Sequence, residues 1–375
     1  MRQGPLIAAI AFWAGAASAQ TLTPVANLPA HRHVLPVHVG GRVVTHPLPD
    51  GGTAYEHQWP GVYFEGRFKG TKAYLAFDDS LNEYRLIVDD GVPMTLNTPG
   101  KALFQITGLK PGTHTLRLEK VTESQGTSGA FDGFSIPPGE KALTVAPRPR
   151  QMEFIGDSSM SGYGDRSTPK CNGDEWRTLS DTQQDYTALT AKHYNADYQV
   201  NAVSGRGLIR NLGGFYPDVS MSHIYPNALI EGTTPYVDPN WQPQIVVVKL
   251  NADFGGDLKP GEPWATRQAL ITEYLKAQAA FATLLHKRYP DAALLLWEPG
   301  DKATPEDARR LEATETIYTN AAHKIGIAHI GFVPNSSAPE ESTGCDGHGS
   351  LTDQKNAAKA LIDYIDAHPE LWNGR

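Results

Sequence analysis

The stretch "MEFIGDSSMSGYGD", residues 152–165, decides the fold, because it joins a buried strand to a loop of polar residues. Its opening "MEFIG" is mostly apolar, which is typical of a strand in a parallel sheet covered on both faces. An acid, serines and glycines follow directly. In open α/β sheets the reactive crevice lies beyond the carboxyl ends of the strands. The sequence therefore predicts that Ser158, the first hydroxyl after the strand, lies in such a crevice.

Residues 148–375 show a repeated pattern of an apolar strand, a loop and a helix. Strands are predicted at 152–157, 198–203, 244–250, 293–298 and 330–334, and helices at 183–195, roughly 264–288, 305–324 and 351–367. Strands that alternate with helices in this way indicate a parallel sheet between two helical layers. The expected fold class is therefore α/β, with a flavodoxin-like three-layer α/β/α domain.

The preceding part of the chain, residues 20–147, has a different pattern. Short, partly alternating runs end at turn residues, and strands are predicted at 61–68, 72–79, 83–91, 102–109 and 114–123. No convincing amphipathic helix is apparent. This spacing predicts an all-β sandwich domain of the jelly-roll type, and the proline-rich segment 137–150 marks its junction with the α/β domain.

The first residues, 1–19, read as a signal peptide: a positive start at Arg2, a short apolar run and small residues before Gln20. The protein is therefore expected to be secreted or periplasmic. No later segment is apolar enough to span a bilayer, so no membrane partner is expected. The formal net charge of −8 and the absence of a basic block argue against a nucleic-acid partner.

A serine nucleophile needs a base, and the base needs an orienting partner. His348 is the best candidate, because it lies in the glycine-rich loop "GCDGHGSLTDQ" (344–354), just before the last helix. Asp346 could accept its imidazole N–H. The N–H groups of Ser158 and of Gly205, in "NAVSGRG" (201–207), could bind an oxyanion. From the residues alone, helix capping by Ser158 and an exposed loop position for His348 remain open alternatives.

The ordered set of Gly-Asp-Ser, a strand followed by Ser-Gly, and Asp-x-His near the C-terminus resembles the SGNH (GDSL) hydrolases. The segments "WPGVYFEGRF" (59–68), "SGRGLIRN" (204–211), "DLKPGEPW" (257–264) and "CDGH" (345–348) bring the resemblance close to carbohydrate esterase family 2, over nearly the whole chain after the signal peptide. This resemblance implies a serine esterase that removes O-acetyl groups from a polysaccharide such as xylan or glucomannan, without a cofactor. It assigns Ser158 as nucleophile, His348 as base, Asp346 as the partner of the base and Gly205 as oxyanion donor.

One block departs from the pattern of this family. The family usually reads L-G-T-N-D-F after the third strand, and its Asn side chain is a further oxyanion donor. This chain reads "KLNADF" (249–254), which places Ala252 where that Asn belongs. Either Asn251 takes over through a shift of the loop, which we favour, or the donor is absent. Glycines also flank His348, where the family has Trp and Pro.

The chain has only two cysteines, Cys171 and Cys345, and both lie in loops that the resemblance places beside the site. We predict a disulfide between them, which would tether the loop of His348. The sequence contains no HExxH motif, no cysteine cluster and no phosphate-binding loop, so neither a metal nor a cofactor is expected. It makes no prediction about oligomeric state.

Two other functions remain open at this stage. The chain could be a catalytically weak or inactive glycan-binding protein on an esterase scaffold, as Ala252 and the glycines beside His348 suggest. It could also be an SGNH esterase that acts on a lipid, a thioester or a peptidoglycan acetyl ester, because fold resemblance is weak evidence for a substrate.

Overall fold

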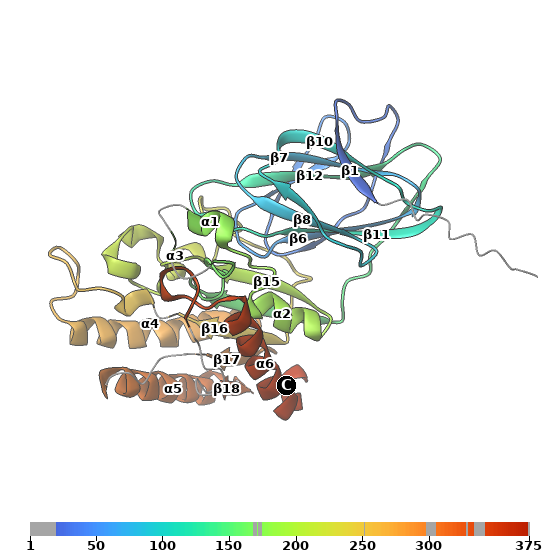
Figure 1. Ribbon diagram of the computed structural model, residues 1–375. Coiled ribbons are helices and arrows are strands. Elements are labelled where there is room, and N and C mark those ends of the chain that lie inside the picture. Colours follow the sequence, from blue (N-terminus) through green and yellow to red (C-terminus); the bar gives the residue numbers. More distant parts are fainter. Residues whose placement is uncertain are drawn as a thin grey trace, which may run out of the picture.

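The computed structural model describes residues 20–167, 171, 175–250, 252–297, 305–327, 329–333 and 342–373. The chain forms two parts that lie against each other (Figure 1). We call residues 20–149, which contain only strands among the regular elements described, the β region. We call residues 150–373 the α/β region. The predicted signal peptide, residues 1–19, and Asn251 lie outside the described residues.

The β region consists of two antiparallel sheets. One has the strand order β1 (Thr21–Val25), β10 (Gly100–Thr107), β7 (Ala73–Asp79), β12 (Gly129–Ile136), β5 (Thr53–His57) and β4 (Val44–Pro47), and β2 (His33–Val34) pairs with β12. The other has the order β13 (Lys141–Leu143), β6 (Tyr63–Gly70), β11 (Gly112–Lys120), β8 (Glu83–Val88) and β9 (Met94–Asn97), and β3 (His38–Gly40) pairs with β6. The five predicted strands correspond to β6, β7, β8, β10 and β11.

One hydrophobic core lies between these two sheets. Phe64 and Leu116 come from one sheet and Leu75 and Phe131 from the other, and all four are fully buried. The rings of Phe64 and Phe131 pack with their centroids 4.8 Å apart. In β8, buried Tyr84, Leu86 and Val88 alternate with the partly exposed residues between them. Such alternation is typical of a strand with one face on a core and the other toward solvent.

The α/β region contains a parallel sheet of five strands. Their order is β15 (Ala196–Ala202), β14 (Arg150–Gly156), β16 (Ile245–Lys249), β17 (Ala293–Leu296) and β18 (Ile330–Phe332). In chain order this is 2-1-3-4-5, the order of flavodoxin-like folds. The prediction of a mixed α/β chain with a parallel sheet is confirmed. The predicted strands match these five, with ends that differ by a few residues.

Helices cover both faces of this sheet, because neighbouring residues of each strand point to opposite sides. Phe154 of β14 packs with α2 (Tyr186–His193) and α6 (Leu351–Ala367), whereas Ile155 packs with α4 (Arg267–Arg288) and α5 (Pro305–Ile325). All four were predicted from the sequence. Shorter turns of helix lie in the loops: α1 (Trp176–Leu179), η2 (Leu212–Gly214), η3 (Pro217–Val219), α3 (Met221–Ile224), η4 (Ala252–Phe254), η6 (Cys345–Gly347) and η7 (Pro369–Trp372).

None of the helices in the described residues is long and apolar enough to cross a membrane.

Candidate active site

The nucleophile candidate lies in the loop that follows β14. Gly156 ends this strand, and a Cβ there would meet Met160 Sδ at 2.5 Å and the carbonyl oxygen of Lys249 at 2.8 Å. Only glycine therefore allows this close approach. The carboxylate of Asp157 accepts hydrogen bonds from the backbone N–H and the hydroxyl of Ser159, at 3.1 and 2.9 Å. This leaves Ser159 turned toward its neighbour.

The structure brings Ser158 and His348 together although 190 positions separate them. His348 Nε2 lies 2.7 Å from Ser158 Oγ, within hydrogen-bond distance. Both residues are partly exposed, so a substrate can reach them. The sequence predicted this contact from the position of each residue in a loop near the sheet.

The other imidazole nitrogen has a partner that the sequence did not predict. His348 Nδ1 lies 2.9 Å from the carbonyl oxygen of Cys345. Because a carbonyl can only accept, Nδ1 carries the proton, and the lone pair of Nε2 is then free to accept the hydroxyl proton of Ser158. The arrangement can therefore deprotonate an alcohol.

The predicted hydrogen bond between Asp346 and His348 is thus wrong. Asp346 has a φ of 52° and Gly347 a φ of 79°, both in the left-handed region. The carboxylate of Asp346 instead accepts a hydrogen bond of 2.9 Å from the Tyr163 hydroxyl. Burial and the neighbouring Asp346 raise the pKa of Tyr163. Asp346 therefore reaches the histidine only through Tyr163.

Tyr163 is a site residue that the sequence analysis missed. Its ring packs on the imidazole of His348, with centroids 4.5 Å apart, and stacks on Trp176 at 5.0 Å. The imidazole is therefore held from its face as well as through Nδ1. The only signal in the sequence is the aromatic residue between two glycines in "GYG" (162–164), which has no specific meaning.

A disulfide joins Cys171 and Cys345, as predicted, with a Cα–Cα distance of 5.2 Å. Cys345 is also the residue whose carbonyl holds the imidazole. On the other side of His348, Ser350 begins α6 with a capping box: its hydroxyl accepts from the Asp353 N–H, and the Asp353 carboxylate accepts from the Ser350 N–H. The short segment that carries His348 is thus fixed at both ends.

The oxyanion candidate Gly205 lies in the loop after β15. Its φ is 75°, a conformation that favours glycine. The loop is joined to that of Ser158, because the hydroxyls of Ser161 and Ser204 lie 3.0 Å apart. The third predicted donor, Asn251, is not among the described residues, but its neighbour Ala252 begins η4. An alanine offers no side-chain donor at that position.

Asp253, directly after Ala252, supports the loop that follows Gly205. Its buried carboxylate accepts the backbone N–H groups of Leu208, Ile209 and Arg210 at 2.7, 2.8 and 2.9 Å. Burial raises the pKa of Asp253 to about 6. Asp253 is therefore a structural residue that connects the loops after β15 and β16.

Comparisons with known proteins identify the family of this chain. Residues 39–147 match the family model described as "Carbohydrate esterase 2 N-terminal". An acetylxylan esterase / glucomannan deacetylase of Cellvibrio japonicus is 37% identical over 342 residues, which cover 90% of this chain and 92% of that protein. The chain belongs to carbohydrate esterase family 2. It is a carboxylic ester hydrolase.

Solved structures of carbohydrate esterases superpose on this family 2 esterase. One, whose active site is described as having divergent catalytic and non-catalytic binding functions, does so with a TM-score of 0.82 at 35% identity, covering 91% of this chain and 100% of that chain. A family 2 enzyme with a carbohydrate binding domain, from Corynascus thermopiles (Myceliophthora fergusii), has a TM-score of 0.70 at 28% identity, covering 88% and 99%.

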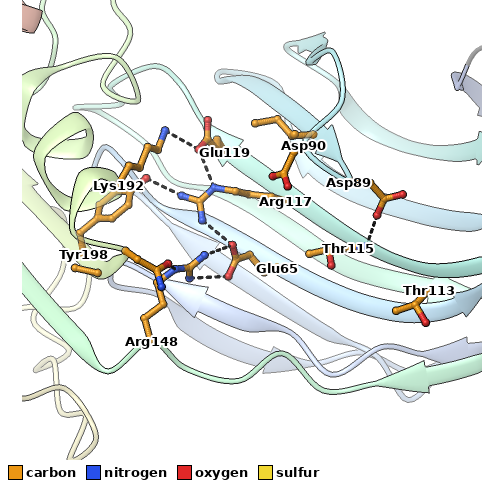
Figure 2. A pocket seen from close by; sticks show the side chains of 13 residues that line it. Glu65, Asp89, Asp90, Thr113, Thr115, Arg117, Glu119, Arg148, Lys192 and Tyr198 are labelled. Atoms are coloured by element: carbon orange, nitrogen blue, oxygen red, sulfur yellow. Dashed lines mark hydrogen bonds and ion pairs between the residues drawn. The ribbon is translucent and has the colours of Figure 1, made fainter.

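The esterase has a further pocket of about 630 Å³ between its β and α/β regions, and none of the candidate catalytic residues lines it. Figure 2 shows Arg117 between Glu65 and Glu119, with ion pairs of 2.7 and 2.8 Å. Arg148 pairs with Glu65 at 2.7 Å, and Lys192 with Glu119 at 2.8 Å. Each of these charges thus has an ion-pair partner, and the pair of Lys192 with Glu119 joins the two regions. We therefore assign them no chemistry.

Proposed function

We propose that this chain is an exported serine esterase that removes O-acetyl groups from a xylan- or glucomannan-type polysaccharide. Ser158 is the nucleophile and His348 the general base. The observation that carries this assignment is the 2.7 Å contact between Ser158 Oγ and His348 Nε2, on an imidazole whose Nδ1 faces a carbonyl. The relative from Cellvibrio japonicus, an acetylxylan esterase / glucomannan deacetylase, supports the choice of substrate.

In the first step, His348 takes the hydroxyl proton of Ser158 while the oxygen attacks the acetyl carbonyl carbon. The N–H groups of Ser158 and Gly205 stabilise the oxyanion that forms. The tetrahedral intermediate collapses, the sugar hydroxyl leaves with the proton held by His348, and an acetyl ester of Ser158 remains. His348 then deprotonates a water molecule, whose oxygen attacks this ester. The second tetrahedral intermediate expels the Ser158 oxygen, which takes the proton back from His348, and acetate is released. Asp346 assists only by fixing Tyr163 against the imidazole.

The surface beside Gly205 fits a polysaccharide. Leu212, Phe215 and Tyr216 follow Gly205 in the same loop and are 51%, 61% and 69% exposed. The ammonium group of Lys259 lies 3.7 Å from the centroid of the Phe215 ring. Exposed aromatic rings can stack on the apolar faces of sugars. We therefore place the polysaccharide backbone across this loop.

We further propose domain boundaries for the chain and a location outside the cytoplasm. Residues 1–19 are a signal peptide, residues 20–147 a jelly-roll domain and residues 148–375 the SGNH catalytic domain. The protein acts outside the cytoplasm, secreted or in the periplasm, where polysaccharide substrates are found. The two antiparallel sheets around one core support the jelly-roll assignment.

The decisive experiment compares the wild type with Ser158→Ala on 4-nitrophenyl acetate and on acetylated xylan and glucomannan. We expect the variant to lose at least about 10³-fold in kcat, because the acetyl group has no nucleophile to receive it. Equal rates for both proteins would exclude Ser158 as nucleophile. Peptidoglycan acetyl esters, thioesters and longer acyl esters in the same panel test the other substrate classes.

A second function, glycan binding with little turnover, is favoured by one observation. Ala252 occupies the position where the family has an oxyanion-binding Asn, and loss of one such donor costs about 10²–10³-fold in turnover. One similar esterase is described as having an active site with divergent catalytic and non-catalytic binding functions. Micromolar affinity for xylan or glucomannan, together with no acetate release from acetylated substrates, would establish binding as the function.

A further inference from the structure

Glu123 lies in the β region, in the loop 121–128 between β11 and β12, yet its carboxylate is directed into the active site. Glu123 is only 2% exposed. Its Oε2 accepts the hydroxyls of Ser161 and Ser204, at 2.9 and 2.5 Å. Its Oε1 accepts the backbone N–H of Ser204 and the side-chain amide of Gln125, each at 2.8 Å. One carboxylate therefore receives four hydrogen bonds.

These bonds tie together the two loops that carry the proposed oxyanion donors. Ser161 lies in the loop of Ser158, and its hydroxyl is also 3.2 Å from the carbonyl oxygen of Ser158. Ser204 directly precedes Gly205. Because Ser204 is held by Glu123 through both its N–H and its hydroxyl, it has little freedom to rotate.

Gln125 contacts the peptide group between Ser204 and Gly205, which carries the proposed oxyanion donor. Its side-chain amide donates to the carbonyl oxygen of Ser204 at 3.3 Å. That carbonyl belongs to the same planar, trans peptide group as the N–H of Gly205, so the two point in opposite directions. A donor that holds the carbonyl on one side therefore directs the N–H to the other side.

The loop 121–128 is itself anchored. The buried ammonium group of Lys120 donates to the carbonyl oxygens of Gln58 and Trp59, at 2.8 and 3.1 Å, and to the hydroxyl of Ser124 at 3.0 Å. The carboxylate of Glu123 is thus presented from the rigid end of β11. Placement of a supporting residue on a rigid element is what a precise site requires.

From these contacts we infer that Glu123 and Gln125 of the β region are positioning residues that orient the Gly205 N–H toward the reacting carbonyl. The β region then contributes to acyl transfer as well as to folding. This inference rests on the proposed function, because it takes Gly205 as an oxyanion donor. The effect belongs to the transition state, since the N–H meets full negative charge only there.

The test measures kcat and KM of Gln125→Ala and Glu123→Gln with 4-nitrophenyl acetate. We expect kcat to fall about 10- to 100-fold with KM within about twofold, because the donor is misdirected but not removed. Affinity for a small alkylboronic acid, which forms a tetrahedral adduct on a serine, should fall by the same factor. Thr127→Ala is the matched control, because Thr127 is exposed in the same loop and makes no contact with Glu123 or Gln125 among the hydrogen bonds described.

A purely structural role would lower the melting temperature without this selective loss of kcat. Gln125 is only half-buried, so Gln125→Ala keeps the test valid if Glu123→Gln does not fold. Rates within twofold of the wild type for Gln125→Ala would overturn the inference, provided that Ser158→Ala is inactive. If Ser158→Ala is also fully active, the proposed function itself is wrong.

Discussion

The imidazole of His348 is oriented by a backbone carbonyl, and this determines how the site responds to substitution. In a Ser-His-Asp triad, the carboxylate fixes the tautomer and stabilises the imidazolium that forms. Here the carbonyl of Cys345 fixes the tautomer, and Asp346 contacts the ring only through Tyr163. The side chain at position 346 can therefore change while the Cys345 carbonyl still accepts the Nδ1 proton of His348.

We predict that Asp346→Asn lowers kcat less than about tenfold, whereas His348→Ala lowers it at least about 10³-fold. In a triad, the equivalent Asp-to-Asn change costs about 10⁴-fold because the wrong tautomer forms. Asparagine can still accept from Tyr163, so the packing of the imidazole is preserved. Steady-state kinetics on 4-nitrophenyl acetate decide this, and a loss near 10⁴-fold for Asp346→Asn would show that the carboxylate reaches the histidine during catalysis.

At the residue scale, the sequence indicated the reacting pair but not its supports. Ser158 follows an apolar strand and His348 lies in a glycine-rich loop, and both patterns are local. The acceptor for His348 Nδ1 is a main-chain oxygen, which every residue has, so the residue types in the sequence do not indicate it. Tyr163 and Glu123 act through contacts with residues far away in the chain, which local patterns do not reveal.

The loops that carry the site are fixed by the elements around them. The segment of His348 runs from the disulfide of Cys345 to the capped start of α6. The strands and helices that hold these loops were predictable, because each has a continuous apolar run or a helical period. The short helical turns between them were not, since their conformation depends on tertiary contacts.

We predict that the double variant Cys171→Ser/Cys345→Ser unfolds at lower denaturant concentration and has a several-fold lower kcat. The bond closes a loop across 174 positions, and the chain-entropy model gives about 5 kcal/mol for such a length. Loss of the tether also frees the Cys345 carbonyl that holds the imidazole. Urea titration and kinetics on the folded protein measure the two effects separately, and an unchanged kcat would mean that the loop keeps its conformation without the disulfide.

The buried Asp165, in the loop after β14 that carries Ser158, should make the free energy of unfolding depend on pH. Burial and the nearby Asp181 and Asp185 raise the pKa of Asp165 to about 9. The folded state therefore holds a proton that the unfolded state releases above about pH 4. Stability contributed by this proton is complete at pH 4 and is lost as the pH rises toward 9.

We accordingly predict that Asp165→Asn raises the melting temperature at pH 8 by several degrees and changes it little near pH 4. The amide has the size of the carboxyl group but releases no proton, so it removes the cost of keeping the carboxyl group neutral at high pH. Melting curves of both proteins between pH 4 and 9 provide the measurement. A difference that stays constant over this range would show that Asp165 has the same pKa in both states.

At the scale of the whole molecule, buried charges join the β region to the α/β region. Arg42, between β3 and β4, is fully buried and pairs with Glu153 of β14 at 3.0 Å. It also donates to Gln199 of β15 at 3.1 Å, and its guanidinium lies 4.5 Å from the centroid of the Tyr225 ring. The sequence predicted both regions but not the contact between Arg42 and Glu153. These two residues are 111 positions apart, and no local sequence pattern relates them.

We predict that Arg42→Met lowers the free energy of unfolding by about 3–5 kcal/mol, because it leaves the charge of Glu153 buried and unpaired. Arg42→Met/Glu153→Gln should recover part of that loss. The control is Arg32→Met, which removes a surface ion pair with Asp50 and should cost at most about 1 kcal/mol. Urea unfolding curves give all three values. Equal effects of Arg42→Met and Arg32→Met would mean that water reaches the buried pair.

The ion pair of Arg42 and Glu153 has a consequence for the engineering of this enzyme. If recombination near residue 148 replaced the β region by an unrelated sugar-binding module, Arg42 would be lost. The buried carboxylate of Glu153 in the α/β region would then have no counter-ion, so we expect such an exchange to fail. Fusions that add modules should therefore succeed at the outer ends of the chain and fail at the internal junction.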